Sequence, residues 1–340
     1  MTAPVLLPTP AQFGGVAKEA AANPGTPVAM TNTLLTDNLV YQDLPQWLSD
    51  QANRGVMGTD SFNEIQGVVW STISMGGPLN TDTFGFLAAN ILGDVVTTGA
   101  SSPFTHAIAL LNPTSGNPGA QPVTDTFTAY NGVPATVGAR QIPYGCLSQL
   151  VVDFDALSGL LKWTATVMGW PTVLPGARPT AAPSSVKPLA PWIGTVGVGG
   201  TAVGAPVATL RTGKITMNRE IEPEPTVNGL QKPLGMARAG FSVTTDLTFI
   251  AQDESIYNHM INNDEPQVQL IFSAGANQSI TFDFQQMAFQ NIKPDYGAKV
   301  VRWATQTNKC VFNSTNVGAS GGQGPMKITL VNSLPSGTYA

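Results

Sequence analysis

The residues with the clearest chemical potential in this sequence are acidic. Glu220, Glu222 and Glu224 alternate with Ile221 and Pro223. In an extended segment, alternate side chains point to the same side, so these three carboxylates would share one face. Like charges this close repel each other. A solvated loop is the simple interpretation, and a negative surface that faces something it must not bind is the sharper hypothesis.

A second acidic pair, Asp153 and Asp155, repeats the alternation on a smaller scale. This pair lies just before a predicted hairpin turn, where Asp is common because its side chain bonds to the turn backbone. The turn alone is therefore enough to explain why Asp occurs at these two positions.

Residues for catalysis or metal binding are sparse. The Gly-Ala-Ser-Gly-Gly run at 318–322 has the spacing of a nucleophile elbow, but Ser320 lacks the following helix which that chemistry requires. The two histidines are His106, alone on an apolar strand, and His259, five residues after Glu254 and so outside helical contact distance. No Cys/His group has zinc spacing. We expect no catalytic residue, no metal and no cofactor.

The composition restricts the kind of surface that this protein presents. Only 11% of its 340 residues are charged, against about 25% in an ordinary domain. With 42% hydrophobic residues the chain folds, so its surface is mostly uncharged, and either other chains cover much of it or the protein works outside the crowded cytosol. A net charge of -5 argues against tight binding to DNA phosphates.

No segment resembles a membrane anchor or a secretion signal. The longest apolar run, 84–92, is far shorter than the roughly 20 residues of a membrane helix. Residues 1–8 have no basic residue before their apolar stretch and contain prolines, which is unlike a signal peptide.

The elements that must position these residues are mainly strands. Apolar and polar residues alternate over 241–249, and the segments 150–155 and 160–167 flank a short turn, which predicts a hairpin. In 280–289 the apolar positions change from even to odd, which predicts a β-bulge near 285–286. Helices are expected only near 82–92 and 253–262, each after a long strand.

These elements predict a mainly β protein built from antiparallel sandwich or barrel modules, each with a short flanking α-helix. We expect an N-terminal arm with inter-subunit contacts at 1–60, a first β module at 61–170, a proline-rich extended linker at 171–191 and a second β module at 192–340. The order strand, helix, strands occurs around 61–170 and again around 206–332, a weak internal repeat.

The order of several segments resembles the major tail tube proteins of long-tailed, siphovirus-type bacteriophages, particularly those of actinobacterial hosts. The segments are 67–70, 84–93, 104–107, 140–143, 147–153, 161–169, 192–200, 218–220 and 253–257. They span most of 60–335, and the similarity lies in their order more than in any single residue.

The resemblance implies a β-sandwich subunit with a flanking helix, whose sheets continue across subunit boundaries. Such subunits form rings, commonly hexameric, which stack into a hollow tube around a tape measure protein. Tail terminator and distal tail proteins are further expected partners. The location would be the phage tail of the virion, with assembly in the host cytoplasm. A duplicated chain would form a trimeric ring with pseudo-sixfold symmetry, and 1–60 and 171–191 are candidates for contacts between rings.

DNA passing through such a tube must slide, and a basic wall would hold it. We therefore expect the acidic residues, either the Glu220 group or the Asp153 pair, to line the lumen. Two alternatives stay open: a capsid decoration or tail-fibre protein, and an extracellular β-rich hydrolase that would depend on Ser320 or His259.

Overall fold

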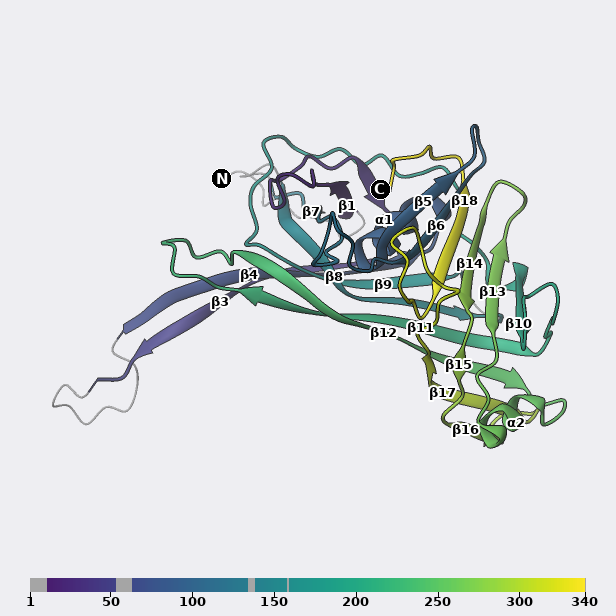
Figure 1. Ribbon diagram of the computed structural model, residues 1–340. Coiled ribbons are helices and arrows are strands. Elements are labelled where there is room, and N and C mark those ends of the chain that lie inside the picture. Colours follow the sequence, from purple (N-terminus) through teal and green to yellow (C-terminus); the bar gives the residue numbers. More distant parts are fainter. Residues whose placement is uncertain (1–10, 53–62, 134–137, 158, 340) are drawn as a thin grey trace, which may run out of the picture.

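The computed structural model describes residues 11–52, 63–133, 138–157 and 159–339. Two antiparallel sheets and two short α-helices account for the regular structure of these residues (Figure 1). The larger sheet has 12 strands: β1 (Phe13–Lys18), β2 (Asn32–Leu34), β3 (Asn38–Asp50), β4 (Asn63–Pro78), β7 (Asp125–Tyr130), β8 (Ala139–Asp155), β9 (Lys162–Gly169), β11 (Leu210–Glu224), β12 (Gly235–Ile250), β15 (Met287–Ala288), β16 (Ile292–Asp295) and β17 (Arg302–Cys310).

The smaller sheet has six strands, in the order β10-β13-β14-β18-β6-β5. Their bounds are β5 (Gly93–Thr98), β6 (Phe104–Leu110), β10 (Gly194–Val198), β13 (Val268–Ser273), β14 (Ser279–Phe284) and β18 (Lys327–Asn332). The helices are α1 (Thr81–Leu92) and α2 (Ser255–Asn262), with a short 3-10 turn, η2 (Pro191–Ile193). The prediction of a mainly β, antiparallel protein with two short helices is confirmed.

Helix α1 lies in the core, and all 12 of its residues are buried. It packs on β8 of the large sheet and on β18, β5 and β6 of the small one, so it is enclosed and not flanking as expected. Asn80 caps its start by accepting from the Thr83 N–H at 2.9 Å, and Gly93 ends it with a φ of 95° that favours glycine. A helix that is apolar on nearly every side is stable only when other elements surround it.

Two buried arginines complete the C-terminal end of α1. Arg219 donates to the Ile91 carbonyl at 2.8 Å, and Arg238 donates to the Asn90 carbonyl at 3.1 Å. The last carbonyls of a helix have no partner within it and carry partial negative charge, so cationic donors stabilise them. This contact ties the helix to β11 and β12.

The predicted hairpin at 150–167 is confirmed as β8 and β9. Leu161, Trp163, Ala165 and Val167 are all buried on the core side, as the alternation predicted. The amphipathic strand at 241–249 is also confirmed within β12.

The predicted bulge near 285–286 is wrong. Strand β14 belongs to the small sheet and β15 to the large one, so Gln285 and Gln286 connect two sheets. The two sheets face the core from opposite sides, so a chain that passes from one to the other must change which positions point inward. Phe284 and Met287, on either side of the connection, are both fully buried.

The strand pairings repeat along the chain. The first set is β3·β4, β4·β9, β9·β8 and β5·β6, and the second is β11·β12, β12·β17, β17·β16 and β13·β14. In each set the helix follows the second strand, which gives both halves the same topology. We call β3-β4-β9-β8 and β11-β12-β17-β16 the first and second quartets. They join through β8·β11 into a continuous run of eight strands, the wall sheet.

Segments outside the quartets are integrated into the fold. Part of the N-terminal segment forms β1 and β2 at one end of the large sheet, where Val16 and Leu34 are buried. Within the proline-rich segment, Leu189 is buried, and its N–H donates to the Leu79 carbonyl at 2.9 Å. Each sheet contains strands from both sides of this segment.

Candidate assembly surfaces

The wall sheet carries two long hairpins that project from the body in the same direction (Figure 1). They are β3–β4 and β11–β12, and the loop at the end of β11–β12 touches β4 partway along the first hairpin. The Val69 N–H donates to the Gln231 carbonyl at 2.8 Å, and the Gln231 side chain donates to the Gln66 carbonyl at 3.1 Å. The projection is therefore one supported unit in which the second hairpin braces the first.

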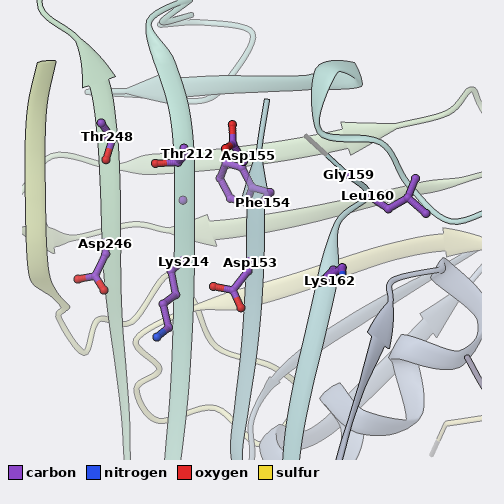
Figure 2. A pocket seen from close by; sticks show the side chains of 11 residues that line it. Asp153, Phe154, Asp155, Gly159, Leu160, Lys162, Thr212, Lys214, Asp246 and Thr248 are labelled. Atoms are coloured by element: carbon purple, nitrogen blue, oxygen red, sulfur yellow. The ribbon is translucent and has the colours of Figure 1, made fainter. Parts of the chain in front are cut away.

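A row of alternating charges crosses the exposed face of the wall sheet, the face that points away from the core. Asp153 lies opposite both Lys162 and Lys214, and Lys214 lies opposite Asp246. Figure 2 shows the side chains of Asp153, Lys214 and Asp246 on three neighbouring strands. Opposite charges directly across a sheet attract, so this row favours the native register.

The environment of Asp153 contains charges of both signs. Burial raises the pKa of Asp153 above its usual value, the Lys214 ammonium lowers it, and the Asp246 carboxylate raises it again. Lys162 is also ion-paired with Asp37 at 3.1 Å, so three carboxylates alternate with two ammonium groups and most of the negative charge along the row is neutralised. Asp155, opposite Thr212, accepts from the Leu157 N–H at 2.8 Å, which agrees with the turn role expected for an Asp there.

The Glu220 group has a different setting. Glu220, Glu222 and Glu224 are exposed on the part of β11 that continues beyond its last pair with β8, Asn218 with Gln149. The residues opposite Glu222 and Glu224 are Ala237 and Gly235, so no cation lies across from either carboxylate. These three charges form the unbalanced acidic part of the wall.

All five predicted acidic residues lie on one face of the wall sheet. Lys214, Glu220 and Glu224 occupy alternate positions of β11, and Lys214 pairs directly with Asp153. The two groups are nonetheless separated by several residues along β11, about 33 Å between Lys214 and Glu224 at the usual rise of a strand. The structure therefore brings them to the same surface without making them one cluster.

Three residues of the charge row, Lys162, Lys214 and Asp246, were not predicted as site residues. The first could have been found from the hairpin, because the turn length places Lys162 opposite Asp153. The other two depend on the pairing of β8 with β11, whose strands are far apart in sequence, so no local signal exists.

The residues required for a hydrolase are not assembled. Ser320 accepts from the Asn112 N–H at 3.1 Å, and its own N–H donates to the Asp94 carboxylate at 2.6 Å. His106 is buried between Thr97 and Asn332, and His259 bonds to Asp264 at 2.7 Å. Neither histidine is a hydrogen-bond partner of Ser320, so the serine has a structural role in its loop.

No helix within the described residues is long and apolar enough to cross a membrane. The fold of two antiparallel sheets matches the mainly β subunit that the resemblance implied. A family model described as phage tail tube protein matches residues 11–331. This chain belongs to the phage tail tube protein family.

The tail tube protein is thus a structural component of the phage tail, within the virion, and it is not an enzyme. Family membership implies self-assembly within the tail. A comparison of the tail tube protein with curated proteins finds no match.

Proposed function

We propose that this tail tube protein forms rings of three chains, in which each chain supplies two quartets of the tube wall. The observation that carries the proposal is the repeated set of pairings within the wall sheet. Two quartets with the same topology in one chain give pseudo-sixfold symmetry from three subunits. A head-to-tail contact of this kind closes into a ring when its rotation allows.

The dimensions of the wall support three chains. Eight strands spaced by about 4.8 Å make a wall about 38 Å wide for each chain. Three chains then close a barrel about 37 Å across, before strand tilt widens it, which leaves room for a DNA duplex inside the side chains. Six chains would double this diameter, far beyond what a duplex requires.

The exposed face of the wall sheet is the proposed lumen surface. It carries the row of alternating charges at Asp153 and the carboxylates of Glu220, Glu222 and Glu224, which have no cation opposite them. An acidic surface repels phosphates and releases no counterions from the DNA, so the DNA passes without being bound. Asp155 would lie near the end of this surface, beside the β8–β9 turn.

The projecting hairpins are the proposed contact between rings. Trp47, Leu48 and Ile65 on the β3–β4 hairpin are each more than half exposed, which is unusual for large apolar side chains. A neighbouring ring would cover them and so use part of the uncharged surface. Further partners in this proposal are the tape measure, tail terminator and distal tail proteins of a siphovirus-type phage with an actinobacterial host.

Electron microscopy of tubes grown from the purified chain tests this proposal. The expected result is stacked rings with threefold symmetry and six similar wall units around the bore. Native mass spectrometry of released rings should give a mass of three chains. Rings of six chains would contradict the proposal, even if the tubes were otherwise normal.

A further inference from the structure

The two edges of the wall sheet are β3 and β16. Within the described residues, β3 pairs only with β4, and β16 pairs only with β17. Open strand edges attract other strands and are normally shielded. Strand β3 is the first strand of the first quartet, and β16 is the last strand of the second quartet.

The chain contains a template for how such edges meet. At the centre of the wall sheet, the last strand of the first quartet, β8, pairs with the first strand of the second, β11, in antiparallel register. Strand β16 is the counterpart of β8, and β3 is the counterpart of β11. If the repeat continues into a second copy, β16 of one chain meets β3 of the next.

The equivalence of the strands is fixed by two tryptophans. Trp163 on β9 follows Lys162, which lies opposite Asp153. Trp303 on β17 follows Arg302, which lies opposite Asp295. The pairs Lys162–Asp153 and Arg302–Asp295 therefore hold the same place in the two quartets. Asp295 is the counterpart of Asp153.

The hairpins fix the other side of the junction. Gly77 lies opposite Trp163, and Phe249 lies opposite Trp303, so these two residues are equivalent. Counting three residues back along each strand makes Ser74 the counterpart of Asp246. Ser74 pairs with Val40, and Asp246 pairs with Lys214. Val40 is therefore the counterpart of Lys214.

From these equivalences we infer that β16 of one chain pairs antiparallel with β3 of a second copy, with Asp295 opposite Val40 and Lys293 opposite Gln42. The inference rests on the proposed ring and gives it a defined register. Asp153 opposite Lys214 is the template for the first pair, and Val151 opposite Thr216 is the template for the second.

The backbone of β16 is suited to this pairing with one exception. The Gln306 N–H donates to the Asn291 carbonyl at 2.9 Å, so by strand alternation Lys293 and Asp295 also bond toward β17. The backbone groups of Ile292 and Pro294 then face the free edge. Proline supplies a carbonyl there but no N–H, so the junction has one donor fewer than β8·β11.

The same alternation makes Asp295 and Val40 a non-hydrogen-bonded pair, with Cα atoms about 4.5 Å apart. This separation lies within the range that a disulfide spans. Within one chain the two residues lie at opposite edges of eight strands, about 34 Å apart, so only different chains can be linked through them. Cys146 and Cys310 are buried and unpaired, so they do not compete.

The test is oxidative crosslinking of assembled full-length chains that carry Val40→Cys and Asp295→Cys. The expected product on denaturing gels is a ladder that ends in a closed ring of three chains and disappears on reduction. The control pair, Gln42→Cys with Asp295→Cys, lies two residues out of register and should crosslink at least tenfold less. The intrachain pair Lys214→Cys with Asp153→Cys should form a disulfide within single chains, which shows that two cysteines at this register position can be oxidised to a disulfide.

A second in-register pair, Lys293→Cys with Gln42→Cys, guards against a local folding defect in the first. If tubes form but neither in-register pair crosslinks above the control, the inferred junction is wrong while the tube proposal stands. If chains with wild-type edges form no rings at all, the ring and the junction both fail.

Discussion

Trp163 and Trp303 occupy the same register position in the two quartets, and each indole N–H donates to a carbonyl just before a helix. The Trp163 indole bonds to the Pro78 carbonyl at 3.2 Å, ahead of α1, and the Trp303 indole bonds to the Asp253 carbonyl at 2.8 Å, ahead of α2. The repeat thus extends from strand order to a tertiary contact. Each tryptophan fixes the point at which a long strand turns into its helix.

Replacing these tryptophans by phenylalanine should have unequal effects. Trp163 is buried, so Trp163→Phe leaves the Pro78 carbonyl without a partner and should cost about 1–3 kcal/mol of unfolding free energy. Trp303 is only partly buried, and water can replace its bond, so Trp303→Phe should cost about 1 kcal/mol or less. Urea denaturation of unassembled subunits measures both. Equal losses would show that the contact does not depend on burial.

The Gly85–Tyr339 contact should show strong coupling. A Cβ atom at Gly85 would lie 2.4 Å from the Tyr339 ring, whose hydroxyl donates to the Asp82 carbonyl at 2.6 Å. Gly85→Ala should therefore cost about 1–3 kcal/mol through overpacking. In a Tyr339→Ala background, which itself is strongly destabilised, the same change should cost much less. A double-mutant cycle with additive losses would contradict this contact.

Asp125 should make stability fall as pH rises. Burial raises the pKa of Asp125 to about 7, despite the Asn90 side chain, which donates to its carboxyl at 2.6 Å. The unfolded group has a pKa of about 4, so between pH 4 and 7 the folded state binds more protons than the unfolded state. Its contribution is present below pH 4 and is lost as pH approaches 7.

The variant Asp125→Asn keeps the shape and the acceptor oxygen but cannot ionise. Thermal unfolding of unassembled subunits at several pH values should show a shallower fall in stability between pH 4 and 7 than in the unmodified protein. Glu265→Gln, which removes a carboxylate at an exposed site just after α2, is the matched control and should leave the slope nearly unchanged. Identical slopes for Asp125→Asn and the unmodified protein would mean that this carboxyl does not titrate in that range.

Charge reversal should test the proposed lumen surface. Glu222→Lys places a cation on the unbalanced acidic part of the wall, whereas Glu265→Lys makes the same net change at an exposed residue just after α2. Phage carrying Glu222→Lys should eject DNA more slowly, with the defect decreasing as salt rises, because phosphate contacts depend on counterion release. Ejection kinetics followed with a DNA-binding dye measure this. A comparable delay in both variants would argue against a lumen position for Glu222.

The sequence by itself determined the local features. Alternation predicted β12 and the β8–β9 hairpin, since a half-buried strand must expose every second residue. The apolar run before Gly93 predicted α1, and Gly93 itself marked its end. The shared face of Glu220, Glu222 and Glu224 also followed from extended geometry alone.

Features that depend on pairing between distant segments were decided only by the tertiary structure. At Gln285 and Gln286 the buried positions change from even to odd residue numbers. A β-bulge and a crossover between sheets give this same local pattern, and only the position of the small sheet distinguishes them. The Lys214–Asp153 pair depends on two strands that are distant in sequence, so no local periodicity encodes it. The burial of α1 likewise requires both sheets to be in place. Residue spacing fixes which side chains share a face, whereas the choice of neighbouring strand depends on the free energy of packing the whole core.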